Sequence, residues 1–277
     1  SRNLLSTGQA VLLPRDYAVL KYIWDWKVVS ASSIHNAVFK GAAFATCRVR
    51  LWHLENAGFL ASIASKDRKK FLLTLTRKGF DCVLGTIVGL GEYGYRSEAV
   101  NHDILTMAFQ HECLSILGEA AQVVITEQHL RRIKIDVLDD RIPRTSLHRP
   151  DGIILPQSSH GDGVIVEVEL NPKSKADYEL IRTYYRNFAP SFRVCWLFAD
   201  ASVERVVRKC VIEQSNPERH STTTMTSFLK PLLAPYGRTT ESLPGSNGGW
   251  ARVILDGRRS ESVSEGSRFI KDNDFTN

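Results

Sequence analysis

The sequence has few cysteines, and they lie far apart. The five cysteines are odd in number and form no C-x-x-C pair among the 277 residues. This pattern indicates neither a disulfide framework nor a cysteine zinc site, and it favours a reducing, cytoplasmic setting. No apolar run approaches the ~18 residues that a bilayer-spanning helix requires, so a membrane-spanning protein is excluded as well.

Several common motifs are also missing. The first residues, Ser-Arg-Asn, lack the order of charged, apolar and small residues that marks a secretory signal. We find no glycine-rich phosphate loop, no nucleophile-elbow motif and no internal repeat. Apolar residues make up 43% and charged residues 24% of the chain, which is near the globular average. The length then predicts about two domains of roughly 150 residues each.

Positive charge gathers in the first part of the chain. Residues 1–80 carry 13 Lys or Arg against 4 Asp or Glu, a balance of +9, whereas the remainder carries −3. A basic module joined to a slightly acidic one predicts that the first module binds a polyanion. A basic surface that serves only solubility stays open as the alternative.

Three short helices and a hairpin are expected in the basic part. Apolar residues at helical spacing follow Pro14, and Ser30 to Ser33 offer N-caps for a second helix. A third helix is expected over residues 42–56, with Phe44, Cys47, Leu51 and Leu54 on its inner face and Ala57-Gly58 at its end. Two apolar segments around a cationic stretch, residues 65–70, then indicate a β-hairpin.

This order is that of a winged helix, a helix-turn-helix variant whose third helix enters the major groove of DNA. The outward face of the third helix and the hairpin tip supply the candidate DNA-binding residues. These are Thr46, Arg48, Arg50, His53, Lys66, Arg68, Lys69 and Lys70. Val49 and Trp52 also point outward, which is more typical of a protein contact, so a winged helix used only for protein binding stays open.

The second part reads as an α/β (α+β) domain. Helices are expected over residues 98–117, 174–187 and 203–212, and strands over 122–126, 149–155, 164–170 and 193–198. A glycine-containing linker covers 85–97 and separates the winged helix (10–84) from the α/β domain (98–214). Residues 215–277 form a polar extension, much of it loop, in which Trp250 to Leu255 suggest one added strand.

Three carboxylates mark a candidate site in this domain. Side chains alternate along a strand, so Glu167 and Glu169 share the face opposite Val164, Val166 and Val168. Two neighbouring buried carboxylates need a positive partner, and Mg²⁺ accepts such ligands. Asp151, at the mouth of the preceding strand, supplies a third. The alternative is a solvated face on which the glutamates pair with Lys173, Lys175 or Arg182.

The spacing of Pro150-Asp151 and Glu167-Val168-Glu169 resembles the core of PD-(D/E)XK nucleases. The resemblance implies a Mg²⁺ (or Mn²⁺) site that cleaves phosphodiester bonds, with Asp151, Glu167 and Glu169 as metal ligands. Glu169 stands where that family has its lysine, so Lys173 or Lys175 would take the catalytic lysine's role, or the site would be inert. Asp103 or Glu112 matches the acidic residue that the family often has on its first core helix.

A wider set of motifs resembles the replication-relaxation family over about residues 10–200. The motifs are Leu13-Pro14-Arg15-Asp16, Arg50-Leu51, Leu54, Ala57-Gly58-Phe59, Leu75-Thr76, Gly79, His102, Arg149-Pro150-Asp151-Gly152 and Glu167-Val168-Glu169. Proteins of that bacterial family are associated with plasmids and mobile elements and are thought to act in replication or mobilisation. The resemblance implies double-stranded DNA as partner, in the bacterial cytoplasm.

Three functions remain open at this stage. The first is a DNA-binding protein whose nuclease-like domain hydrolyses DNA with Mg²⁺. The second is an inactive DNA-binding regulator or accessory factor, because a nuclease-related fold does not guarantee cleavage. The third is a subunit of a homodimer or of a recombination or mobilisation assembly, with Val49 and Trp52 at the contact.

Overall fold

The computed structural model describes residues 11–64, 71–117, 121–143, 145–156 and 163–228. The chain divides into two compact units. Unit 1 comprises Ser1–Val88 and Tyr95–Glu98, and unit 2 comprises Gly89–Gly94 and Ala99–Asn277. The wing residues 66 to 70 and the expected strand at 250–255 lie outside the described residues.

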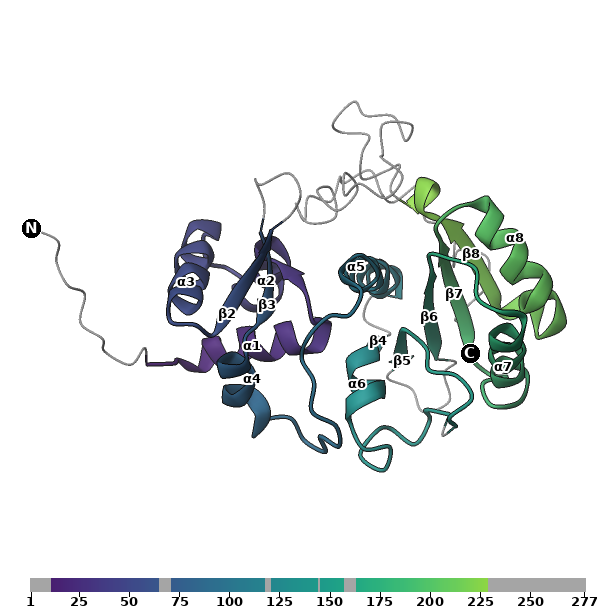
Figure 1. Cartoon of the computed structure of the whole chain (residues 1–277), viewed down its shortest axis with the longest axis horizontal. Helices are drawn as coiled ribbons and strands as arrows, with labels where there is room; N and C mark the ends of the chain where they lie inside the picture. The colour runs from purple at the N-terminus through teal and green to yellow at the C-terminus, as the bar shows by residue number, and fades with distance from the viewer. Residues whose placement is uncertain (1–10, 65–70, 118–120, 144, 157–162, 229–277) are drawn as a thin grey trace, which may run out of the picture. The chain divides into compact units, whose positions relative to one another are not determined.

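Within its described residues, unit 1 joins four helices to a three-stranded sheet (Figure 1). Its elements are α1 (Pro14–Trp26), β1 (Val29–Ser30), α2 (Ala31–Val38), α3 (Phe44–Asn56), β2 (Leu60–Ala64), β3 (Phe71–Leu75) and α4 (Arg77–Leu84). The strands are antiparallel in the order β1–β3–β2. Three helices followed by a β-hairpin that pairs with a short first strand form the predicted winged-helix arrangement.

Local sequence explains where these helices begin and end. The Ser30 hydroxyl accepts a hydrogen bond from the Ser33 amide at 3.0 Å, so Ser30 is the expected N-cap of α2. Gly41, between α2 and α3, and Gly58, after α3, have φ values of 81° and 77°, which only glycine adopts without strain. The inner face of α3 is as predicted except at Phe44, which is 42% exposed and packs edge-on against His35 instead of the core.

Unit 2 is built on a five-stranded mixed sheet in the order β4–β5–β6–β7–β8. Strands β4 to β6 are antiparallel, whereas β7 and β8 continue parallel to β6. Its main elements are α5 (Val100–Leu117), β4 (Ala121–Thr126), α6 (Glu127–Arg132), β5 (Gly152–Pro156), β6 (Val164–Glu169), α7 (Lys175–Asn187), β7 (Arg193–Phe198), α8 (Ala201–Cys210) and β8 (His220–Thr224). Two 3-10 turns, η2 (Ile212–Gln214) and η3 (Pro217–Arg219), precede β8.

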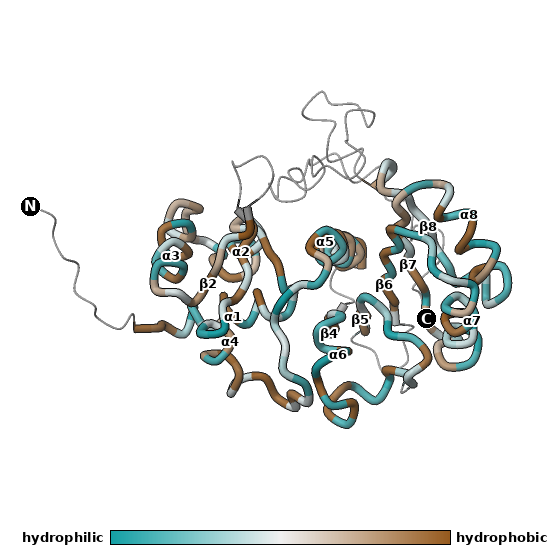
Figure 2. The backbone as a smooth tube through the Cα atoms, in the orientation of Figure 1, coloured by the Kyte–Doolittle hydropathy of each residue, from teal (hydrophilic) through white to brown (hydrophobic). Residues whose placement is uncertain are grey.

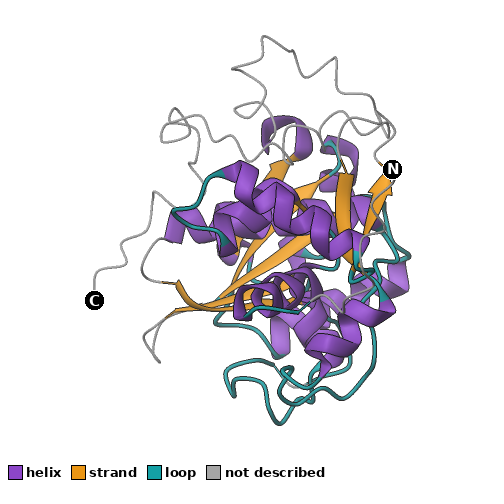
Figure 3. Cartoon of the chain, turned by 90° about the vertical axis from the view of Figure 1, so that its left-hand side faces the viewer, coloured by secondary structure: helices purple, strands orange, loops and turns teal. Residues whose placement is uncertain are grey.

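Helices cover both faces of this sheet. Helix α5 packs on β5 and β6, and α7 and α8 lie together on the other face (Figure 1). Figure 3 shows these helices and strands from a second direction. The order helix, strands, helix, strand, helix is the one expected from the sequence. The predicted α/β (α+β) fold class is thereby confirmed.

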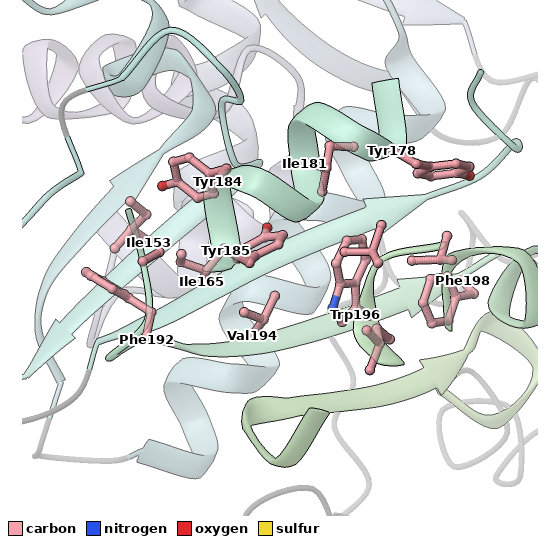
Figure 4. Close-up of a cluster of buried hydrophobic side chains, with 14 of the residues drawn as sticks. Ile153, Ile165, Tyr178, Ile181, Tyr184, Tyr185, Phe192, Val194, Trp196 and Phe198 are labelled. Carbon is pink, nitrogen blue, oxygen red and sulfur yellow. The ribbon is translucent and has the colours of Figure 1, made fainter. Parts of the chain in front are cut away.

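The core of unit 2 lies between the sheet and α7. All four expected inward residues of this helix, Tyr178, Ile181, Tyr184 and Tyr185, are at most 3% exposed. They pack on side chains of β5, β6 and β7, among them Ile153, Ile165 and Trp196 (Figure 4). The hydropathy tube of Figure 2 shows the corresponding hydrophobic colouring along β6 and β7. Glu167 and Glu169 interrupt this apolar surface.

Two features of unit 2 differ from the sequence analysis. Residues Ser221 to Thr224 are not part of a loose polar tail, because they form most of β8, whose register pairs Trp196 with Thr222. Helix α6 was not expected from the sequence. Its Gln128 Nε2 donates to Gly94 O at 2.8 Å, and Arg132 O accepts from Gly91 N at 2.7 Å. The expected linker is therefore divided, with residues 89–94 held against α6.

Among the described residues, none of the helices combines the length and the apolar character that crossing a membrane requires.

Candidate functional site

Helix α3 presents the candidate DNA-binding surface of unit 1. Cys47, Leu51 and Leu54 are buried and fix this helix against the core. Thr46, Arg48 and His53 are exposed on its other side, as are Val49 and Trp52. The turn before it is held by a hydrogen bond of 2.8 Å between His35 Nε2 and Ala42 O. The helix therefore displays polar and basic side chains from a rigid position.

Arg50 lies apart from this exposed set because it is bound to Asp16 of α1. Its Nε donates to Asp16 Oδ1 at 2.7 Å, and its Nη2 contacts Oδ2. Burial of Asp16 would raise the pKa of its carboxyl, but the hydrogen bonds from Arg50 and the Leu13 amide hold it below the ordinary value. The interaction holds α3 against α1. It engages the Arg50 guanidinium, which was expected from the sequence to contact DNA.

In unit 2, Asp151 stands immediately before β5, and its carboxylate bridges to neighbouring elements. Its Oδ2 accepts from the Val168 amide of β6 at 2.7 Å and lies 3.4 Å from His102 Nε2 of α5. Burial would lower the pKa of His102, but the Asp151 and Asp103 carboxylates raise it to about 11, so the ring is protonated. Burial likewise opposes ionisation of Asp151, yet the His102 charge and the Val168 amide hold its pKa below the ordinary value.

Glu167 is buried and bound by two polar side chains. Only 4% of the residue is exposed. Its Oε1 receives the Tyr185 hydroxyl and lies 2.6 Å from His148 Nε2. Burial, and then the charge of Glu167, raise the pKa of Tyr185 well above its ordinary value, so its hydroxyl remains a donor. Hydrogen bonds from Tyr185 of α7 and His148 of the loop before β5 thus offset the free-energy cost of burying the Glu167 carboxylate.

Glu169 pairs with Lys173, four residues later. The Lys173 ammonium contacts Glu169 Oε2, and its main-chain amide donates to the Tyr178 hydroxyl at 2.9 Å. Glu169 is 5% exposed, whereas the Lys173 side chain is 40% exposed. Burial raises the pKa of Glu169 above its ordinary value, although Lys173 opposes the rise. Lys175, the other candidate lysine, is exposed on the first turn of α7.

The three carboxylates of Asp151, Glu167 and Glu169 form one electrostatic group, called here the carboxylate cluster. Lys173 is the cation common to them. Burial lowers its pKa, but Glu169, then Glu167 and Asp151, outweigh that effect and raise it. Of the two lysines that the resemblance offered as a replacement, the structure therefore brings Lys173 to the cluster. The pairing of Glu169 with Lys173 also matches the alternative weighed from the sequence, except that both glutamates are buried.

As placed, the three carboxylates are bonded to protein donors. Carboxylate oxygens are suitable ligands for Mg²⁺, and each of these carboxylates uses one oxygen for a protein donor. Among the residues that the structure describes, however, no three His, Cys, Asp or Glu side chains are grouped so that they could hold a metal ion. His102 and Lys173 balance part of the negative charge of the cluster, and hydrogen bonds from His148 and Tyr185 stabilise Glu167.

Three partners of the cluster, His102, His148 and Tyr185, were not expected from the sequence. His102 appeared there only as part of a family motif, and Tyr185 only as an inward helix residue. His148, three residues before Asp151, gave no signal of its own. Of the two acidic residues on α5, Asp103 lies beside His102, with 3.9 Å between Oδ1 and Nδ1. Glu112 lies nine residues further along the helix.

Comparison with known proteins adds little to these observations. No protein-family model matches the sequence, and no curated protein matches it. The crystal structure of the transcriptional regulator Tm0710 from Thermotoga maritima aligns with 38% of this chain at 20% identity and a TM-score of 0.24. The aligned part covers 63% of that regulator, so the chain spans less than two thirds of its length. A likeness this weak carries no argument about function, and the resemblance to replication-relaxation proteins rests on the quoted motifs alone.

Proposed function

We propose that this chain is a DNA-binding protein that holds duplex DNA through unit 1. The observation that carries the proposal is the exposed face of α3, where Thr46, Arg48 and His53 stand outward on a helix fixed by its buried side. In helix-turn-helix proteins, side chains in this position reach base edges and phosphates. Residues 65–70, which join β2 to β3, add three Lys and one Arg in sequence.

The biological setting of this binding rests on the family resemblance. Replication or mobilisation of a plasmid or mobile element is the role that the motifs imply. Within that role, unit 1 would hold the element's DNA, and unit 2 would contact the backbone or an assembly partner.

Substitution of Arg48 tests the proposal directly. Arg48→Ala should weaken binding of the full chain to a 30-base-pair duplex about five- to twenty-fold, because the variant cannot form one charge-assisted hydrogen bond to DNA. Fluorescence anisotropy at 100 mM salt measures the change. Arg205→Ala, an exposed arginine of α8 in unit 2, is the matched control and should bind as the wild type does. Equal affinity of the wild type and Arg48→Ala would refute the assignment of α3.

A second candidate function is cleavage of DNA by unit 2. It is favoured by one observation, the contact of the Lys173 ammonium with Glu169, because Lys173 was one of the two lysines that could replace the lysine missing from position 169. Mg²⁺ or Mn²⁺ is the cofactor that this candidate requires. The Lys173–Glu169 ion pair and the bonds to Glu167 weigh against it and favour an accessory factor that contacts DNA or protein without cutting.

A nicking assay separates these two candidates. If unit 2 cleaves, the purified chain should convert supercoiled plasmid to open circles with Mg²⁺ or Mn²⁺, and Asp151→Asn should abolish the conversion. The matched control is Asp136→Asn, an exposed carboxylate outside the cluster, which should keep full activity. Equal nicking by Asp151→Asn would assign the activity to a contaminant. No nicking with either metal would support the accessory role.

A further inference from the structure

An apolar line runs along the exposed face of α3. Ala45, Val49 and Trp52 are spaced four and three residues apart, so their side chains follow one another on the same side of the helix. We call these three residues the α3 strip. Val49 is 56% and Trp52 57% exposed, and Ala45 is exposed as well. Apolar side chains of this size on a basic surface indicate a contact that covers them.

The strip lies in the middle of the candidate DNA-binding face. Arg48 borders it on one side, and Thr46 and His53 border it on the other. Ala45 and Val49 occupy the first two turns of α3, the part of a recognition helix that contacts base edges. Trp52 extends the line, with its ring 4.9 Å from the His53 ring in an edge-on arrangement.

Among the groups that base edges expose in the major groove, one is apolar: the 5-methyl of thymine. The other groups at base edges are hydrogen-bond donors and acceptors. An aliphatic side chain packed on them displaces water and leaves their hydrogen bonds unmade. We infer that Val49, with Ala45, contacts thymine methyl groups, so that unit 1 selects duplexes with thymines at fixed positions. This inference rests on the proposed DNA binding and adds the base that is read.

The charge of this region favours DNA over a second copy as the occupant of the strip. Residues 1–80 carry a balance of +9. A symmetric dimer through α3 would use the same patch on both copies and bring two Arg48 side chains and two such charges together. A duplex, with its regular negative charge, complements the same surface.

Removal of the thymine methyl tests the inference. The tightest-binding sequence from a random 20-base-pair pool is synthesised in two forms, with thymine and with uracil, which differ only in that methyl. The full chain should bind the uracil form about four-fold more weakly for each methyl contacted. Val49→Ser should lose this discrimination while still binding DNA, and Val206→Ser, an exposed valine of α8, should retain it.

Each outcome decides a separate question. Equal affinity for the two forms, or a selected sequence without thymine, would overturn the thymine contact and leave DNA binding intact. Failure to bind any duplex would overturn the proposed function itself. Should Trp52→Ala or Val49→Ser abolish self-association in sedimentation and leave the thymine preference unchanged, the strip is an interface between copies and the inference is wrong.

Discussion

At the residue scale, His220 shows how hydrogen bonds fix a protonation state. The indole Nε1 of Trp196 can only donate, and it donates to His220 Nδ1 at 3.0 Å. The ring proton therefore resides on Nε2, which lies 3.1 Å from the Ser215 hydroxyl. That hydroxyl in turn donates to Val211 O at 2.9 Å. Protonation of Nδ1 would break the bond from Trp196, so the folded chain holds this histidine neutral.

This restraint predicts a pH-dependent stability. Burial lowers the pKa of His220 from 6.5 to about 4. The unfolded chain then binds the proton more readily between these values, so stability is complete above pH 6.5 and falls as the pH drops towards 4. The loss should reach roughly 2 to 3 kcal/mol. Urea unfolding at pH 7.5, 5.5 and 4.5 measures it.

The control for this prediction is a variant without a titrating ring. His220→Gln keeps an oxygen that can accept from Trp196 Nε1 and should show a shallower decline over the same pH range. If the wild type and His220→Gln decline in parallel, other groups dominate and the assignment to His220 is incorrect.

At the element scale, the position of α4 depends on the close approach of its backbone at Gly79 to the backbone at Phe59. The amide of Gly79 donates to the Thr76 hydroxyl oxygen in the N-cap of this helix, at 3.1 Å. A Cβ at Gly79 would lie 2.1 Å from the carbonyl oxygen of Phe59, which belongs to the connection between α3 and β2. A backbone atom cannot rotate away as a side chain does, so glycine is required there to seat α4.

Two glycine substitutions test this contact. Gly79→Ala should destabilise unit 1 by about 2 to 4 kcal/mol despite the better helix propensity of alanine, because the helix must move off the sheet. Gly85→Ala, at the C-cap of the same helix, meets no atom within 4 Å and should be neutral or slightly stabilising. Thermal unfolding compares the two. A Gly79→Ala midpoint equal to that of Gly85→Ala would contradict the packing.

Periodicity predicted the elements whose burial follows a regular pattern. Leu20, Ile23 and Trp24 are fully buried on α1, as their spacing indicates, whereas Tyr17, the first residue of the same expected face, is 40% exposed. Periodicity did not predict β8, because its His-Ser-Thr-Thr-Thr sequence has no apolar alternation. This edge strand is held by main-chain pairing with β7. The cluster was found through Asp151 and the two glutamates. Its partners His102, His148 and Tyr185 were not, since tertiary contacts that span 18 or more residues leave no local pattern.

At the scale of the whole molecule, charge separates the two parts of the chain. The +9 balance of residues 1–80 contrasts with −3 in the remainder. If the chain binds DNA as proposed, this distribution favours approach of the duplex to unit 1. The negative phosphates are attracted by its basic residues and repelled by the acidic residues elsewhere. Much of the positive charge comes from the wing cations, defined as Lys66, Arg68, Lys69 and Lys70, which lie outside the described residues.

The wing cations should contribute to affinity through phosphates and therefore through salt dependence. Replacing all four with Ala should weaken duplex binding and reduce the slope of log K against log salt by about 3 to 4, because each phosphate that is no longer neutralised lowers it by one unit or slightly less. Binding titrations between 50 and 300 mM NaCl measure the slope. An unchanged slope would mean that the hairpin does not touch the backbone.

The position of Glu167 on β6, the middle strand of the sheet, gives its carboxylate a part in folding. Without this carboxylate, the buried Tyr185 hydroxyl and the His148 ring would lose their shared acceptor. A Glu167 variant that loses activity would therefore need a folding control, because the same substitution removes a buried acceptor from the core.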